Sequence, residues 1–402
     1  MAKKRRDTSH FALIDWNFKA ESSRSFLHNI CWYPSRFIPV IPAQLISSLS
    51  SPGDTVLDPF CGSGTTTVEA LKAGRNAISV DLSPVACYLT RVKSRLLTQR
   101  RISLAPLYEL LGELEVLRRT DPNSPQLFDQ LEEGASLNSV MVPNLEEKAP
   151  WFHPDTLQQL AYIHSRVSRL SGGLCRDAAN VIFLGILMSS TGYPGGRSYT
   201  YYADNVKPRK ELVYKDALKL YSTKLSKFLS EYRLHPLAEN GRVSSRVFTC
   251  DSRRLLTVVK ERCDLIVTSP PYLGIADYLT GFRLAYQWFD LVEDLDHLKR
   301  SEIGARYRRH TKKNTKLATY KEDFDAVSEQ MVNALKSRGY LCLVLGEPKQ
   351  YYASVREHIV EQFQTAYDLS LQDSFAREIS KKFFLHPSGG VPTEEILVFQ
   401  KR

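Results

Sequence analysis

The sequence predicts an α/β fold with a parallel, doubly wound sheet. Short apolar strand signals alternate with helical stretches in two blocks, at about 28–101 and 246–402. The connections between them are short, which is typical of strand–helix–strand units. A glycine-rich turn follows one strand and a proline pair follows another, at the edge where open α/β sheets bind ligands.

The first block contains a strand over 55–58, a glycine-rich turn, a helix over 67–73 and a second strand over 76–80. Gly74 ends the helix at the C′ position, where glycine is favoured. Asp81 follows the second strand directly. The second block contains further strands, which we expect at 247–250, 264–268, 340–345 and 395–399.

The two blocks are separated by a long stretch of helical character. It includes helical patterns over 155–170 and 178–188, and its length excludes a simple loop. We therefore expect a helical insertion subdomain, and target recognition by this insertion, by the segment that follows residue 272, or by both. The sequence predicts three parts: 1–101 with the glycine-rich turn, the insertion 102–241, and 242–402 with the proline pair and a basic segment at 299–321.

Charge and hydropathy limit the class of protein. The chain has 402 residues, with 54 Lys and Arg against 44 Asp and Glu, and a formal charge of +10. A polyanionic partner fits this excess, although a basic protein that is merely soluble would show it too. No run of 18 apolar residues is present, and the basic N-terminus lacks the apolar region of a secretory signal. We therefore expect a cytoplasmic protein, associated with no membrane.

Cysteine and histidine spacing predicts neither disulfides nor a metal site. The seven cysteines include no C-x-x-C pair, and the histidines form no H-x-x-x-H or mixed Cys/His ligand spacing. We expect reduced, mostly buried thiols and no metal.

The glycine-rich turn excludes two common cofactor motifs. It lacks the lysine of a phosphate-binding P-loop and the third glycine of a dinucleotide fingerprint. Gly62 and Gly64 allow tight backbone conformations at the start of a helix, and Asp81 is suitably placed to accept hydrogen bonds from a ribose diol. The whole turn reads Asp58-Pro59-Phe60-Cys61-Gly62-Ser63-Gly64-Thr65-Thr66.

This turn resembles the D-P-F-x-G-S-G-T-T cofactor motif of amino-group DNA methyltransferases, which bind S-adenosylmethionine. The alternative is a glycine-rich turn without a ligand. The resemblance implies a Rossmann-like methyltransferase sheet and S-adenosyl-L-methionine as cofactor. The cofactor-binding residues that it implies in this turn and after the next strand are Asp58, Pro59, Phe60, Gly62, Gly64, Thr65, Asp81 and Leu82.

A second motif, Ser269-Pro270-Pro271-Tyr272, follows the apolar strand at 264–268. Prolines cannot continue a central strand, so the chain leaves the sheet here as a stiff loop. We expect Ser269 Oγ and the Pro270 carbonyl to accept hydrogen bonds from a nucleobase amine, and Tyr272 to stack on the flipped base. Such acceptors favour the pyramidal nitrogen that attacks a methyl group. A tight surface turn is the alternative interpretation.

The same four residues resemble motif IV of this family and are the catalytic candidates. The serine form is typical of enzymes that methylate cytosine N4, whereas acidic or amide forms are typical of adenine N6 enzymes. Cytosine N4 is therefore the expected target.

Two flanking segments add cofactor candidates. Asp251 ends the strand at 247–250 and resembles the acid that reaches the adenine amine of the cofactor, although a helix N-cap is an equally suitable role. Tyr33, Pro34 and Phe37 lie in a segment that resembles the cover over the methionine end. Packing in the core is the alternative for these three.

Two basic clusters are candidate nucleic-acid contacts. Basic residues alternate with tyrosines around Arg197, and an acid-free run extends from 306 to 316. A solvated loop or packing on the insertion would explain them as well. The residues that we expect to bind nucleic acid are Arg197, Arg306, Arg308, Arg309, Lys312 and Lys313.

The resemblance implies a methyltransferase for double-stranded DNA in a prokaryotic restriction-modification or related defence system, associated with the nucleoid. A separately encoded restriction endonuclease is an expected partner. Adenine N6 in DNA, a guanine amine in tRNA, and a nucleic-acid-binding protein without catalysis remain the alternatives.

Overall fold

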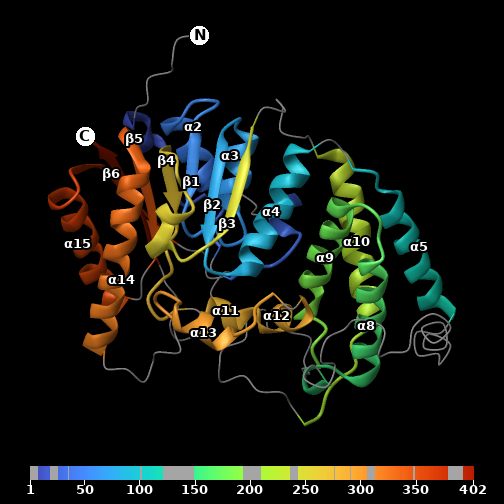
Figure 1. Ribbon diagram of the computed structural model, residues 1–402. Coiled ribbons are helices and arrows are strands. Elements are labelled where there is room, and N and C mark those ends of the chain that lie inside the picture. Colours follow the sequence, from blue (N-terminus) through green and yellow to red (C-terminus); the bar gives the residue numbers. More distant parts are fainter. Residues whose placement is uncertain are drawn as a thin grey trace.

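The computed structural model has a seven-stranded sheet with helices on both faces (Figure 1). It describes residues 8–18, 26–34, 36–99, 102–120, 149–192, 210–235, 243–275, 277–289, 291–305, 313–346, 349–378 and 393–402. The strands are β1 (Thr55–Asp58), β2 (Asn76–Asp81), β3 (Ser245–Thr249), β4 (Cys263–Thr268), β5 (Leu335–Leu345), β6 (Leu369–Glu378) and β7 (Thr393–Lys401).

Helices of very different length surround the sheet. Before β3 they are η1 (Ser9–Leu13), α1 (Phe26–Asn29), α2 (Val40–Leu49), α3 (Thr65–Lys72), α4 (Pro84–Thr98), α5 (Ala105–Thr120), η2 (Ala149–Trp151), α8 (Pro154–Ser168), α9 (Gly173–Leu187) and α10 (Ala217–Leu234). After β3 they are η3 (Ser252–Thr257), α11 (Tyr278–Gly281), α12 (Arg283–Phe289), α13 (Leu295–Arg300), α14 (Lys313–Ala334) and α15 (Lys349–Thr365).

The strand order is β3-β2-β1-β4-β5-β7-β6. The first five strands of this order are parallel, and β7 pairs antiparallel with both β5 and β6. The chain moves outward from β1 to β3 and then returns to the other side of β1 at β4. This reversal places a crevice between the carboxyl ends of β1 and β4, where open α/β sheets bind their ligands.

Both faces of the sheet are buried, which explains the nearly continuous apolar strands. Successive side chains point to opposite faces: Val56 joins the core with α2, α3 and α4, and Leu57 joins the core with α14 and α15. Leu265 and Ile266 of β4 divide in the same way. The α/β prediction is confirmed, but the sheet is mixed rather than wholly parallel, because β7 runs antiparallel to β5 and β6.

One strand, β6, was not predicted from the sequence. β6 is one of the two edge strands, and its side chains are largely half-buried or exposed, so it lacks the apolar run that marks the central strands. The strand predicted at 340–345 is also longer than expected, because β5 begins at Leu335 directly after α14.

The segment predicted as an insertion is helical where the structure describes it, and it packs on the sheet domain. Its helices α5, α8, α9 and α10 lie on the β3 side of the sheet, where α9 packs on α4 and the other three pack on α9 and on one another (Figure 1). Their buried residues, such as Phe183 and Leu225, belong to the same core cluster as Val92 of α4. The Arg283 guanidinium of α12 also lies 4.8 Å from the ring centroid of Trp151. The helical segment thus shares its core with the sheet.

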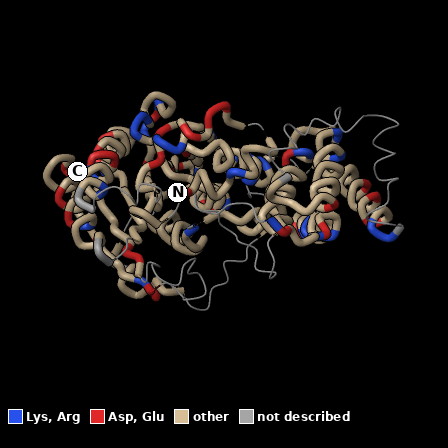
Figure 2. Tube along the Cα trace, turned by 90° about the horizontal axis from the view of Figure 1, so that it is seen from below, with Lys and Arg blue, Asp and Glu red and all other residues tan. Residues whose placement is uncertain are grey.

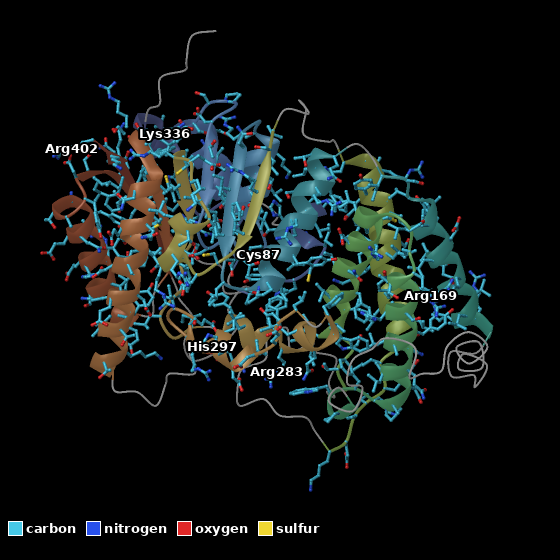
Figure 3. All side chains as sticks on the ribbon, viewed as in Figure 1. Cys87, Arg169, Arg283, His297, Lys336 and Arg402 are labelled. Atoms are coloured by element: carbon cyan, nitrogen blue, oxygen red, sulfur yellow. The ribbon has the colours of Figure 1, made fainter. Side chains whose placement is uncertain are left out.

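The two ends of the strands are covered differently. At the amino ends, Lys336 Nζ donates to Asp264 Oδ2 at 2.9 Å, and the Thr55 N–H donates to the same oxygen at 3.0 Å. Figure 3 shows Lys336 at these ends and His297 and Arg283 at the opposite ends, where α11, α12 and α13 lie. These short helices cover the carboxyl ends of the strands.

Among the described residues, no helix is both long and apolar enough to cross a membrane.

The turn between β1 and α3 requires glycine for steric reasons. Gly64 has φ of +80°, and a Cβ there would lie 2.7 Å from Thr90 Oγ1 of α4. Gly53, in the turn before β1, has a similar φ of +86°, but a Cβ there would have no atom within 4 Å.

We therefore expect Gly64→Ala to destabilise the protein more than Gly53→Ala. Gly53→Ala adds only left-handed backbone strain, about 1–2 kcal/mol, whereas Gly64→Ala adds a steric clash of about 1–3 kcal/mol as well. The free energy of unfolding from denaturant titration measures both. Equal losses at the two positions would contradict the tight packing of the turn on α4.

Candidate functional site

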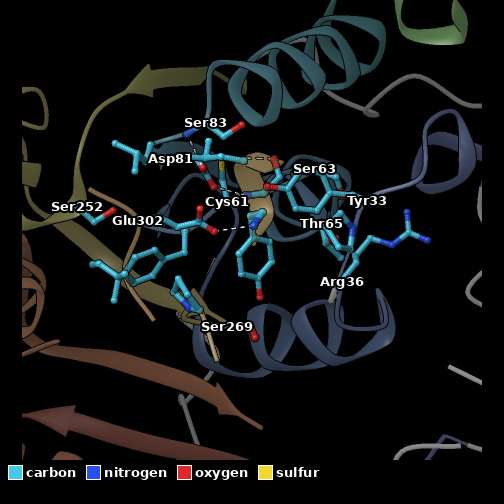
Figure 4. Close-up of a pocket in the computed structure, with 18 of the residues that line it drawn as sticks. Tyr33, Arg36, Cys61, Ser63, Thr65, Asp81, Ser83, Ser252, Ser269 and Glu302 are labelled. Atoms are coloured by element: carbon cyan, nitrogen blue, oxygen red, sulfur yellow. Dashed lines mark hydrogen bonds between the residues drawn. The ribbon is translucent and has the colours of Figure 1, made fainter. Parts of the chain in front are cut away.

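A cavity opens at the crevice between β1 and β4, under α11 and α13 (Figure 4). Asp58 at the end of β1 accepts a hydrogen bond from Thr268 Oγ1 at the end of β4, at 2.7 Å. Both are buried, and burial raises the pKa of Asp58 to about 6. This bond joins the strands from which the glycine turn and the proline loop emerge.

The structure brings most of the expected cofactor residues to this cavity. The lining includes nine of them: Tyr33, Pro34, Phe37, Phe60, Gly62, Thr65, Asp81, Leu82 and Asp251. Asp58, Pro59 and Gly64 do not line it. Asp58 and Gly64 support the site from behind, through Thr268 and through the packing of the turn on α4.

The glycine turn is held by α4 from its rear side. Thr90 Oγ1 donates to the Gly62 carbonyl at 3.1 Å, and Lys93 Nζ donates to the Ser63 carbonyl at 2.7 Å. Lys93 is fully buried, and burial lowers its pKa to about 7. Because α4 binds these carbonyls, the turn keeps one conformation against the cavity. Lys93 carries no motif and was missed from the sequence.

Asp81 faces the cavity with its orientation fixed (Figure 4). Its Oδ2 accepts from the Gly62 N–H and its Oδ1 from the Ser83 N–H, both at 2.8 Å. Each carboxylate oxygen keeps a further lone pair, so the group can accept hydrogen bonds from a diol. Burial raises the pKa of Asp81 to about 6.

Asp251 combines the two roles that its sequence position allowed. It caps η3 by accepting from the Arg253 N–H at 2.9 Å, and it also lines the cavity. The Arg253 guanidinium pairs with the same carboxylate and with Asp323 of α14. Arg253 therefore connects Asp251, which lines the cavity, to α14 and fixes the position of this carboxylate.

The segment before α2 closes the cavity on the side of the glycine turn. The Tyr33 ring stacks on Phe282, with centroids 5.1 Å apart, and would lie 3.0 Å from a Cβ at Gly62. Arg36 lines the cavity as well and donates to the His28 carbonyl. Glycine at position 62 thus makes room for the tyrosine ring.

The proline loop contributes only part of what was expected. Ser269 and Pro271 line the cavity, whereas Pro270 and Tyr272 do not. Tyr272 is 5% exposed and its hydroxyl donates to Glu394 Oε1 at 3.0 Å, so the expected stacking on a base does not fit this arrangement. The ring is held against Gly346 instead. Tyr320 of α14 donates to the Pro271 carbonyl at 2.9 Å and steadies the loop.

The segment after this loop also lines the cavity, although none of its residues was among the expected site residues. Glu302 accepts from the Tyr278 N–H at 2.6 Å, which ties α11 to the end of α13 (Figure 4). The other lining residues of this segment are Tyr278, Leu279, Ser301 and Ile303. An acid between two loops carries no motif, so only the fold reveals that Glu302 reaches the cavity.

The predicted nucleic-acid contacts lie largely outside the described residues. Arg197, Arg306, Arg308, Arg309 and Lys312 fall there, and Lys313 is the first residue of α14. Lys316, the last basic residue of the second cluster, is 9% exposed, and its Nζ would lie 3.2 Å from a Cβ at Gly274. It packs on the loop after β4.

In the view of Figure 2, Lys and Arg are interspersed with Asp and Glu over both the sheet and the helical segment. Among the described residues, no group of three or more His, Cys, Asp or Glu side chains could hold a metal ion.

Sequence comparisons connect the chain to DNA methyltransferases. Residues 15–91 match the model of a family described as DNA methylase. The type II methyltransferase M.MjaII of Methanocaldococcus jannaschii is 23% identical over 86% of this chain and 77% of its own length. M.BsoBI of Geobacillus stearothermophilus is 29% identical over 36% of this chain and 27% of its own length. M.BglI of Bacillus subtilis is 46% identical over 13% of this chain and 15% of its own length.

Solved structures give weaker similarity. TrmN from Thermus thermophilus aligns with a TM-score of 0.32 and 12% identity, over 91% of this chain and 49% of its own. The rRNA methyltransferase aviRa from Streptomyces viridochromogenes aligns with a TM-score of 0.35 and 11% identity, over 98% and 94%. Similarity at this level adds nothing to the topology described above.

The residues of the cavity fit S-adenosylmethionine. Asp81 offers acceptors to a ribose diol, and the buried Ser63 Oγ lines the cavity without a hydrogen-bond partner among the described residues. The matched family segment contains both the glycine turn and Asp81. The comparisons therefore support an amino-group DNA methyltransferase with S-adenosylmethionine as its cofactor.

We expect cofactor affinity to fall as the pH drops below about 6. The ionised Asp81 accepts hydrogen bonds and attracts a cationic ligand, so binding favours the deprotonated form and lowers its pKa from about 6 in the free protein. Affinity should be full above this pKa and fall by up to about tenfold per pH unit below it.

Isothermal titration calorimetry between pH 5 and 8 measures this dependence. Asp81→Asn should weaken binding and flatten the pH profile, whereas Asp296→Asn, at an exposed position on α13, should change neither. A profile that stays steep in Asp81→Asn would assign the titration to another group.

Proposed function

We propose that this chain is an S-adenosylmethionine-dependent DNA methyltransferase that acts on the exocyclic amine of a flipped base, with cytosine N4 as the preferred target. One observation carries the proposal. The cofactor candidate Asp81 and the base acceptor Ser269 line the same cavity, on the two sides of the β1–β4 crevice. A methyl donor and an amine bound by these two groups would meet in it.

The protein's part in the reaction is positioning and electrostatic stabilisation. A bound cofactor would supply an electrophilic methyl group: its C–S bond would break with the electron pair remaining on sulfur as the C–N bond forms, and the methylated nitrogen would then release a proton to solvent. Asp81 orients the ribose, and Tyr33 and Phe37 cover the cavity. Ser269 Oγ accepts a hydrogen bond from the amine and so favours the pyramidal form of the amine nitrogen. No covalent bond to the protein is required.

The preference for cytosine N4 rests on the serine at the first position of the Ser-Pro-Pro-Tyr loop. Adenine N6 in DNA requires the same acceptor geometry, and a guanine amine in tRNA would require it in RNA. The similarity to type II methyltransferases favours DNA as the substrate. A restriction-modification setting in the cytoplasm and a separately encoded endonuclease as partner are part of the same proposal.

Expression in a host without DNA methylation tests the reaction and the base together. The wild type should produce N4-methylcytosine in genomic DNA, measured by nucleoside mass spectrometry and located by single-molecule sequencing. Ser269→Ala should lower the rate about 10²-fold or more, because it removes an acceptor aimed at the reacting nitrogen, and Asp81→Ala should lower it through cofactor affinity.

Ser230→Ala serves as the matched control, since this serine lies exposed on α10 and donates only to the Lys227 carbonyl. N6-methyladenine instead of N4-methylcytosine would overturn the base assignment. Methylated RNA with unmodified DNA would overturn the substrate class, and cofactor binding without any methylated product would favour a binding protein without catalysis.

We also expect the cluster Arg306, Arg308 and Arg309 to bind backbone phosphates. Replacing all three with alanine should weaken duplex binding and reduce the slope of log K against log salt by about 0.9 for each phosphate that is no longer neutralised. Fluorescence anisotropy at several salt concentrations measures the slope. Arg118→Ala with Arg119→Ala, an exposed pair at the end of α5, is the control, and equal slopes in the two variants would contradict a specific role for the cluster.

A further inference from the structure

A buried chain of hydrogen bonds extends from Ser269 away from the cavity. Ser269 Oγ lies 3.1 Å from the Tyr272 hydroxyl, which lies 3.0 Å from Glu394 Oε1 of β7. The other oxygen of this carboxylate accepts from Arg377 Nη1 of β6 at 2.6 Å. Tyr272, Glu394 and Arg377 are 5%, 7% and 7% exposed. Water therefore has little access to the chain behind Ser269.

The reversed strand β7 makes this chain possible. Because β7 is antiparallel to β5, its first residues lie beside the end of β5, and Glu395 pairs with Leu345. The next residue, Gly346, faces the tyrosine: a Cβ there would lie 2.6 Å from the Tyr272 ring and 3.0 Å from Glu394 Cγ. Glycine at this position leaves the space in which the tyrosine and the carboxylate meet.

The charges define the direction of the hydrogen bonds. An ionised carboxylate only accepts hydrogen bonds and a guanidinium only donates them. Burial raises the pKa of Glu394, while the Arg377 guanidinium and the Tyr272 hydroxyl act in the opposite direction and favour the ionised form. Tyr272 must then donate its hydrogen to Glu394, so its oxygen accepts from Ser269.

We propose that Glu394 and Tyr272 are positioning residues that hold the Ser269 hydroxyl hydrogen away from the cavity, so that Ser269 Oγ acts only as an acceptor toward the target amine. This inference rests on the proposed function of Ser269. A hydroxyl can either donate or accept, whereas an amine that is about to be methylated needs an acceptor. The buried carboxylate gives the serine the polarity that an acidic side chain would have by itself.

The structure supplies a matched control on the other face of β7. Glu395 accepts from Tyr352 and from Arg356 Nε of α15, the latter at 2.7 Å. Neighbouring residues of a strand point to opposite faces, so this second Tyr–Glu–Arg set lies away from the cavity. Loss of the Tyr352 bond tests stability without touching Ser269.

Two variants of the chain should have different effects. In Tyr272→Phe the serine hydroxyl loses its acceptor and can rotate, so the methyl-transfer rate should fall about 3- to 10-fold. In Glu394→Gln, Arg377 attracts the amide oxygen and turns the amide N–H toward Tyr272. The tyrosine must then donate to Ser269, whose hydrogen turns into the cavity. This reversal should cost about 30- to 100-fold.

Single-turnover methyl transfer, at saturating cofactor and DNA, measures these rates in the full-length protein. The dissociation constants of cofactor and DNA should stay within about twofold, because neither residue lines the cavity. Tyr352→Phe should keep the wild-type rate. In a Ser269→Ala background, Tyr272→Phe and Glu394→Gln should have less than twofold further effect, since residues that act through one group are not additive.

The outcomes separate this inference from the proposed function. An inactive wild type, or a fully active Ser269→Ala, would overturn the proposed function. If Ser269→Ala is impaired but Tyr272→Phe and Glu394→Gln keep the wild-type rate, or if their losses persist in full in the Ser269→Ala background, the positioning role is overturned. If Tyr352→Phe loses as much rate as Tyr272→Phe and Glu394→Gln, and the losses follow the decrease in melting temperature in all three variants, the effect is purely structural and the positioning role is overturned.

Discussion

The hydrogen bond between Asp58 and Thr268 connects the two halves of the site. It joins the ends of β1 and β4 at 2.7 Å, where the strand order reverses. The glycine turn begins directly after Asp58, and the Ser-Pro-Pro-Tyr loop begins directly after Thr268. The separation between these two loops therefore depends in part on a pair of buried side chains that do not line the cavity. Families of α/β enzymes place ligands at this crevice for the same topological reason.

Much of the fold could be predicted because its central strands are buried on both sides. Apolar runs such as the one at 264–268 have no other stable place in a protein of this type. β6 could not be predicted, since an edge strand needs no continuous apolar face. The shared core of the helical segment and the sheet could not be predicted either, because Phe183 and Val92 belong to one core but lie far apart in the sequence.

The residues of the site likewise fall into two groups, those that local sequence features indicated and those that only the fold brings to the site. Gly62, Asp81 and Ser269 belong to short contiguous motifs, so the sequence indicated them directly, and the cavity brings them together. Lys93, Glu302 and Glu394 reach the site or its support only through long-range packing, and no local pattern indicated them. Tyr272 shows the limit of a motif. Its identity was evident, but the direction of its ring depends on Gly346 and Glu394, which are distant in sequence.

The shared core of the helical segment limits how far this segment can change. A segment that folds alone can be exchanged as a unit between related proteins. Here α9 packs on α4, and α4 holds the glycine turn through Thr90 and Lys93. Exchange of the whole segment would uncover α4 and disturb cofactor binding at the same time. Changes in the helical segment must then proceed by small substitutions that keep its contacts with α4, so this segment and the glycine turn change together.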